Sequence, residues 1–186
     1  MGCTNAKATR ENSPMPLYAL GDRVPQIHPA AYVHPDAVII GDVVVGPESS
    51  IWPCAVLRGD SNRITVGART SIQDGCAIHC TPANETRIGD GCVIGHNVHM
   101  EGCVVEDGAL VGSGAVVLPR ARIGAGALVA AGAVVPNDVV VPPRALARGV
   151  PVKIVEDAAP QDVIDDSVQQ YIRNARMYPE ALRRLD

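Results

Sequence analysis

The residues from 105 to 141, "VEDGALVGSGAVVLPRARIGAGALVAAGAVVPNDVVV", repeat with a period of six. An aliphatic residue stands at every sixth position: Val105, Val111, Val117, Ile123, Val129, Val135 and Val141. A second series, two residues earlier in each hexad, is mostly small: Cys103, Ala109, Ala115, Ala121, Ala127, Ala133 and Val139. Because side chains of a strand alternate between its two faces, each hexad offers one large and one small residue to the same side. This pattern is typical of a hexapeptide β-helix, in which three hexads make one triangular turn.

The same phase extends towards the N-terminus with two insertions and one dropped residue. The large positions there are all aliphatic or Met: Ile27, Val33, Ile39, Val45, Ile51, Leu57, Val66, Ile72, Ile78, Ile88, Ile94 and Met100. The insertions follow Leu57 and Ile78, and the dropped residue follows Met100. We therefore predict an all-β fold, with a parallel β-helix over residues 21–153.

The two ends of the chain have a different character. Residues 1–14, "MGCTNAKATRENSP", lack the apolar stretch of an export signal, and we expect residues 1–20 to be a disordered or extended N-terminal segment. In residues 154–186, apolar residues recur at helical spacing, from Ile164 through Ile172 to Ala175. We expect this C-terminal segment to be an α-helix packed on the outside of the β-helix.

Composition excludes several classes of protein. The net charge of -4 argues against nucleic acid as the main partner. No apolar run is long enough to span a membrane, and we expect a cytoplasmic protein with reduced thiols. Cys76, Cys92 and Cys103 fall in the small inward series and are interpreted as packing residues. Cys80 follows His79 but lies off that series, and it is interpreted as an inert thiol rather than a ligand.

The repeat also predicts where polar side chains point. The outward residues after Leu57, Ile78 and Met100 are Arg58, His79 and Glu101, which should form one column on a single face. Adjacent turns are about 4.8 Å apart, so neighbouring side chains in the column can share an ion. Both a metal site and a plain surface ion pair fit this arrangement.

Two further histidines lie close to this column in the sequence. His96 belongs to a different face or corner, so it joins the column only if a second subunit of a threefold assembly delivers it. His99 lies two residues before Glu101 on the same predicted strand. It is an alternative third ligand or a group that orients one.

The chain resembles the γ-class carbonic anhydrase family, including its bacterial homologues of unassigned role. The resemblance runs from about Gly21 to Pro151. The segments that carry it are "GDV" at 41–43, "IWP" at 51–53, "RGD" at 58–60, "VGARTSIQDG" at 66–75, "IH" at 78–79, "IGH" at 94–96, "EGC" at 101–103 and "GVPVK" at 149–153.

The resemblance implies a left-handed β-helix that assembles as a homotrimer with a metal at each subunit interface. Zn²⁺ is the expected metal, with Fe²⁺ or Co²⁺ as alternatives. Two of the family's three histidine ligands match His79 and, from the neighbouring subunit, His96. The third falls on position 101, where this sequence has Glu101.

The resemblance also assigns roles to polar residues around the metal. Arg58, Asp60 and Asp74 match residues that link subunits across the interface, and Gln73 matches one near the metal-bound water. The implied reaction is attack of zinc-bound hydroxide on CO₂ to give bicarbonate. Because Glu101 adds negative charge, we expect a less acidic water, with weak anhydrase activity or none and a more alkaline pH optimum.

Two other functions remain open. Hexapeptide β-helices also serve acyltransferases that use coenzyme A, although the inserted loop "CTPANETR" at 80–87 has no His to act as a base. A non-catalytic trimer that binds a small ligand or a partner protein is the third possibility. Metal content distinguishes the first function from the other two.

Overall fold

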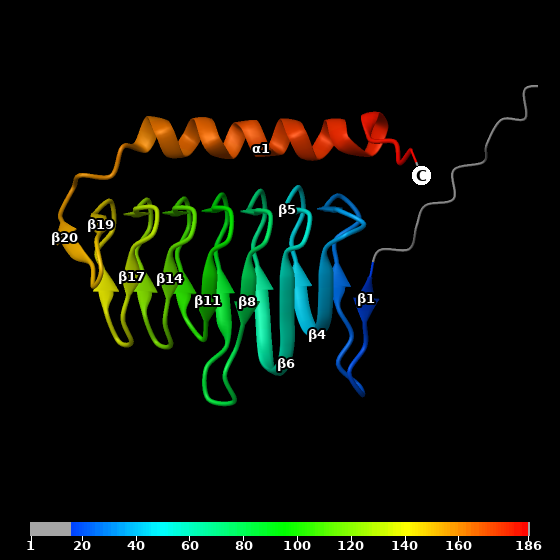
Figure 1. Ribbon diagram of the computed structural model, residues 1–186, viewed down its shortest axis with the longest axis horizontal. Helices are drawn as coiled ribbons and strands as arrows, with labels where there is room; N and C mark the ends of the chain where they lie inside the picture. The colour runs from blue at the N-terminus through cyan, green and yellow to red at the C-terminus, as the bar shows by residue number, and fades with distance from the viewer. Residues whose placement is uncertain (1–15, 186) are drawn as a thin grey trace, which may run out of the picture.

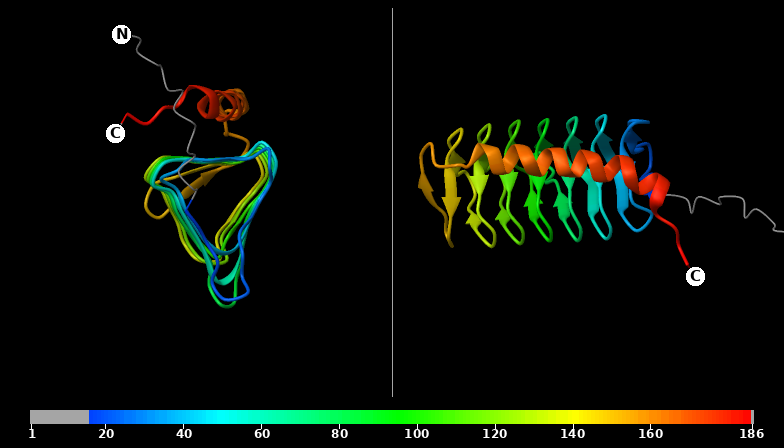
Figure 2. Two further views of the ribbon diagram at one scale, coloured as in Figure 1. Left: turned by 90° about the vertical axis from the view of Figure 1, so that its right-hand side faces the viewer. Right: turned by 90° about the horizontal axis from the view of Figure 1, so that it is seen from above.

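The computed structural model describes residues 16–185, which form a triangular solenoid with one long helix alongside it (Figures 1 and 2). The expectation for residues 1–15 lies outside this range. The solenoid begins earlier than the predicted boundary at residue 21, because Leu17 and Tyr18 pair with Ile39 and Ile40 in the next turn. The predicted fold class, a left-handed parallel β-helix with a C-terminal helix on its outside, is confirmed.

The strands stack in three flat faces. Face one contains β1 (Leu17–Tyr18), the first half of β4 (Val38–Val45), the first part of β6 (Val56–Val66), β8 (Ala77–His79), β11 (His99–Glu101), β14 (Val116–Val117) and β17 (Val134–Val135). Face two contains β2 (Gln26–Ile27), the remaining parts of β4 and β6, β9 (Thr86–Ile88), β12 (Val104–Val105), β15 (Arg122–Ile123) and β18 (Val140–Val141). Face three contains β3 (Tyr32–Val33), β5 (Ser50–Ile51), β7 (Ser71–Ile72), β10 (Val93–Ile94), β13 (Leu110–Val111), β16 (Leu128–Val129), β19 (Leu146–Arg148) and the antiparallel β20 (Lys153–Val155).

The core is the interior of this prism, and the two inward series fill it. From Val33 to Val141, every predicted large position is at most 5% exposed. Only Ile27, in the first turn, is half-buried. Cys76, Cys92 and Cys103 are buried free thiols, as predicted, and desolvation by burial raises the pKa of each to about 12. These three sulfurs are therefore uncharged packing groups.

The C-terminal helix α1 (Gln161–Ala181) covers face three (Figure 2). Its buried residues are Ile164, Ile172 and Ala175, on the face that the sequence predicts. Trp52, the residue after β5, packs against the helix with its ring edge-on to Tyr171 and Tyr178. Faces one and two have no such cover within the described residues. No helix in the described part of the chain is long and apolar enough to cross a membrane.

The narrow interior predicts that a larger side chain at a small inward position destabilises the fold. Ala127 is fully buried in the small series, whereas Ala125, two residues earlier, is exposed at a corner. Ala127→Leu should lower the free energy of unfolding by about 1–3 kcal/mol, because the prism has no room for three more carbons. Ala125→Leu, the matched control, should change it by less than about 0.5 kcal/mol. Urea unfolding of both variants checks this, and equal effects would contradict the account of the core.

Candidate functional site

The predicted outward column on face one is present. Arg58 in β6 pairs with His79 in β8, which in turn pairs with Glu101 in β11. The inward neighbours of these residues are buried, so the three polar side chains must project outward. The register of the core therefore places His79 between two turns that each supply a charged group.

The first insertion brings a further residue to this column. β6 continues from face one to face two without a break, so Asp60 and Ser61 lie at the corner next to His79. Two glycines allow the close approach of β4 and β6 at this corner. A Cβ on Gly41, whose φ is +77°, would lie 2.3 Å from the carbonyl oxygen of Gly59. A Cβ on Gly59 would lie 2.4 Å from the carbonyl oxygen of Asp42.

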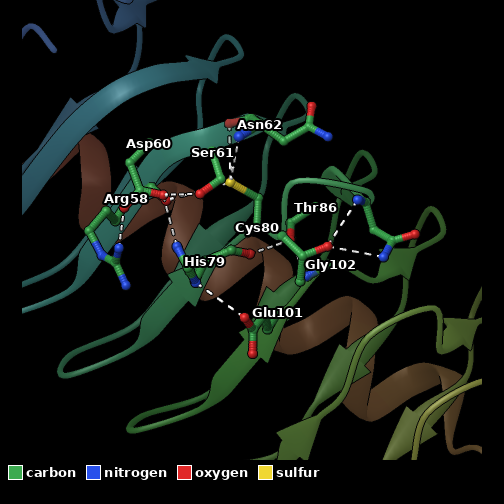
Figure 3. Close-up of polar contacts among 11 residues, drawn as sticks. Arg58, Asp60, Ser61, Asn62, His79, Cys80, Thr86, Glu101 and Gly102 are labelled. Carbon is green, nitrogen blue, oxygen red and sulfur yellow. Dashed lines mark hydrogen bonds and ion pairs between the residues drawn. The ribbon is translucent and has the colours of Figure 1, made fainter.

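Both ring nitrogens of His79 face carboxylates (Figure 3). Nε2 lies 2.9 Å from Oδ1 of Asp60, and Nδ1 lies 3.3 Å from Oε1 of Glu101. The three side chains are partly buried, with 22% to 31% of their surface exposed. Asp60 is also ion-paired with Arg58 and accepts a hydrogen bond of 3.0 Å from Ser61. An imidazole held between two carboxylates is an environment that attracts a cation.

The surroundings of Asp60 lower the pKa of its carboxyl group. Desolvation by burial raises the pKa of its carboxyl group, but hydrogen bonds from His79, Ser61 and Arg58 and the charge of Arg58 outweigh that effect. The resulting pKa is about 2. The carboxylate is therefore charged at any physiological pH.

Cys80 completes this corner. The ligand atoms of Asp60, His79 and Cys80 all lie within 4.8 Å of one another, and within residues 16–185 no other group of three such residues does so. The Cys80 sulfur accepts a hydrogen bond of 3.2 Å from the Asn62 amide. Sequence reasoning assigned Asp60 only by resemblance and read Cys80 as inert. The sequence feature that could have pointed to Asp60 and Cys80 is the break in the repeat after Leu57 and Ile78. An insertion at a corner can fold back over the neighbouring turn.

His96 lies apart from the column, at the corner between face three and face one. Its Nδ1 is 2.9 Å from Oδ2 of Asp74, and its Nε2 is 3.5 Å from the hydroxyl of Tyr171 in α1. Gln73 is buried at the same corner, one turn earlier. One chain thus groups His79, Asp60 and Glu101 in one place and His96 with Asp74 in another. The site shared between subunits stays a prediction.

His99 lies on face one but outside the column. It pairs with Ala77 in β8 and Val116 in β14, whereas Glu101 pairs with His79. Its role as an alternative ligand stays a prediction.

Comparison with known proteins defines the class. The family model described as "Bacterial transferase hexapeptide (six repeats)" matches residues 25–59, 85–119 and 102–137. A putative acetyltransferase of Bacillus cereus is 33% identical with a TM-score of 0.87, and the match covers 89% of this chain and 98% of the other. A hexapeptide transferase family protein from Anaplasma phagocytophilum is 32% identical with a TM-score of 0.84, covering 88% and 98%. The chain belongs to the hexapeptide-repeat transferase family.

A curated relative adds a closer but shorter match. The carnitine operon protein CaiE of Escherichia coli O157:H7 is 46% identical over 96 residues, which are 52% of this chain and 49% of CaiE. The matched region thus spans about half the length of the curated relatives. Since the family and both structural relatives are described as transferases, the comparisons support the acyltransferase alternative better than the carbonic anhydrase expectation.

The pKa of Asp60 makes a prediction about acid stability. Its folded value of about 2 lies below the value of about 3.9 expected for an unfolded chain. Its stabilising contribution is therefore present above pH 4 and is lost as the pH falls towards 2. Between pH 4 and pH 2, the free energy of unfolding should fall less steeply with pH in Asp60→Asn than in the wild type. Glu180→Gln, which alters an exposed carboxylate of α1, should follow the wild type, and parallel curves for all three proteins would contradict the assignment.

Proposed function

We propose that this protein is a trimer that holds a divalent metal ion at each subunit contact and slowly hydrates CO₂. His79 of one subunit and His96 of the next supply the two imidazoles. The observation that carries the proposal is the His79 cluster. An outward imidazole between two carboxylates, with a thiol beside them, is a set of zinc donors.

The local geometry of His96 fits the same role. Its Nδ1 is held by the Asp74 carboxylate, and its Nε2, which lies 3.5 Å from the Tyr171 hydroxyl, is the nitrogen that would bind a metal. Histidine ligands of metals generally donate their other N–H to a carboxylate or carbonyl group, which fixes the ring. Glu101 stands in the same relation to Nδ1 of His79. Each of the two imidazoles therefore already has the partner that such a ligand needs.

The outer surface of face one supports a trimer. Its second column, beside the charged one, is mainly aliphatic: Val38, Val56, Ala77, His99, Val116 and Val134. Parallel sheets are usually covered on both sides, and face three has α1 as its cover. A second copy of the chain is the cover that we propose for face one, with the corner that holds His96 docked against the charged column.

The charged groups around His79 determine how well a metal bound there could hydrate CO₂. A divalent metal bound there supplies a Lewis acid that makes a water molecule nucleophilic near neutral pH. The chain's own residues work partly against this, because Asp60 and Glu101 place two negative charges around His79 and disfavour proton loss from a bound water. Arg58 offsets one of these charges through its ion pair with Asp60. Turnover should therefore be slow at neutral pH and should rise with pH.

Subunit mixing tests whether the site is shared. His79→Ala and His96→Ala should each abolish stoichiometric zinc binding without dissolving the trimer, as measured by metal analysis and light scattering. Co-expression of the two variants should restore zinc to about one quarter of the sites. A contact is intact only where a His96→Ala subunit offers His79 to a His79→Ala subunit, and random assembly of a cyclic trimer makes this happen at one contact in four.

Two outcomes of the mixing experiment would contradict the shared site. Zinc that stays bound in either single variant removes that histidine from the ligand set. If the mixed trimers bind no zinc, then the two histidines either belong to a site within a single chain or do not bind zinc. CO₂ hydration by the wild-type trimer, increasing with pH, then tests the reaction itself.

Acyl transfer from a coenzyme A thioester is a second candidate function. The family and its transferase relatives favour it, and so does the His96–Asp74 pair, since a histidine oriented by a carboxylate is a common general base.

Ligand binding separates the two functions. For an acyltransferase, acetyl-CoA at 100 times its dissociation constant should stabilise the fold by about 2.7 kcal/mol and raise the melting temperature. Acetyl-CoA should leave a zinc hydratase unchanged. Stabilisation by acetyl-CoA combined with absence of bound zinc would replace the first function with the second.

A further inference from the structure

The two nitrogens of His79 face different chemistry. Nδ1 faces only the Glu101 carboxylate. Nε2 faces Asp60, and the Cys80 sulfur lies on this side of the ring, away from Glu101 (Figure 3). A metal bound at Nδ1 would therefore have only the Glu101 carboxylate of this chain near it, whereas a metal at Nε2 would have the Cys80 sulfur near it and the Asp60 carboxylate beside it.

Cys80 differs from the other buried cysteines. Cys76, Cys92 and Cys103 occupy the small inward series, which is mostly alanine, so packing accounts for them. Cys80 is also fully buried in the core, but it lies off that series. Cys80 directly follows an outward histidine and lies at the corner where the first insertion folds over. Its thiol donates to the carbonyl oxygen of Asn62 at 3.1 Å and accepts from the Asn62 amide at 3.2 Å.

We propose that Cys80 is a ligand of the metal and that it binds beside Nε2 of His79. This inference rests on the metal site proposed above and names its third protein ligand. Glu101 stands where the resemblance expects a third imidazole, but it then acts on Nδ1, where it accepts the ring N–H and orients His79. Cys80 then supplies the third protein ligand in place of the residue at position 101.

The resulting set is chemically complete. His79, Cys80 and His96 of the neighbouring subunit would hold the metal through two nitrogens and one sulfur, and a catalytic zinc site with three protein ligands would also bind water. Formation of the metal–sulfur bond displaces the thiol proton, which leaves to solvent. The Asn62 amide stays as a hydrogen-bond donor to the thiolate. Asp60, held by Arg58 and Ser61, lies beside Nε2 of His79.

Loading the protein with Co²⁺ in place of zinc shows directly whether a thiolate is a metal ligand. Co²⁺ bound to a thiolate shows an intense near-ultraviolet charge-transfer band that nitrogen and oxygen ligands do not give. The wild-type trimer loaded with Co²⁺ should show this band, and Cys80→Ser should lose it. Cys76→Ala, a substitution at a buried cysteine of the same turn, should keep it. Glu101→Gln should keep the band but bind Co²⁺ about 10–100-fold more weakly, because only the orienting carboxylate is lost.

The outcomes separate this inference from the proposed function. Wild-type protein that binds Co²⁺ without the band overturns the role of Cys80 and leaves the metal site standing. Wild-type protein that binds no Co²⁺ overturns both. A band that survives in Cys80→Ser, or loss of Co²⁺ in Glu101→Gln but not in Cys80→Ser, also overturns the inference. The wild-type spectrum decides the point even if Cys80→Ser does not fold, because Cys80 supplies the only thiol in such a group within residues 16–185.

Discussion

The in-register stacking of parallel turns is the constraint on which the rest of this structure depends. Each inward side chain lies on its counterpart in the turn before, about 4.8 Å away, and the interior has room for one large and one small residue per hexad. A slip of one residue along a strand would turn every apolar side chain outward, so the core fixes the register. The outward columns are a consequence of the same register. His79 meets Arg58 and Glu101 because Ile78 meets Leu57 and Met100.

This dependence explains how much of the molecule the sequence predicts. A period of six locates the faces, the buried residues and the charged column, because counting along a strict repeat is enough to assign direction. The corners are different. The insertions after Leu57 and Ile78 contain no repeat, and their paths depend on contacts between turns. Such contacts include the close approach of Gly41 to Gly59. They also include the hydrogen bonds that the Thr86 hydroxyl donates to the His79 carbonyl and accepts from the Gly102 amide. The contact of Asp60 with His79, the place of Cys80 and the early start at Leu17 were therefore not predictable from periodicity.

The charges at the corner define what the scaffold can do. A fold does not by itself select a chemistry, and the relatives of this chain are described as transferases. In this chain His79 has a carboxylate at each ring nitrogen, and neither nitrogen is left for a substrate. That arrangement suits a bound cation better than a general base. His96, with one nitrogen on Asp74 and the other near Tyr171, suits either role, so its partner in the assembly decides between them.

Anomalous scattering from crystals of the zinc-loaded protein tests the central claim most directly, because it locates the metal and the subunit contact together. The account predicts a zinc peak at every subunit contact of a trimer, about 2.0–2.1 Å from Nε2 of His79 and from an imidazole nitrogen of the neighbour's copy of His96. A monomer, or a trimer in which these two imidazoles lie far apart at every contact, would contradict it.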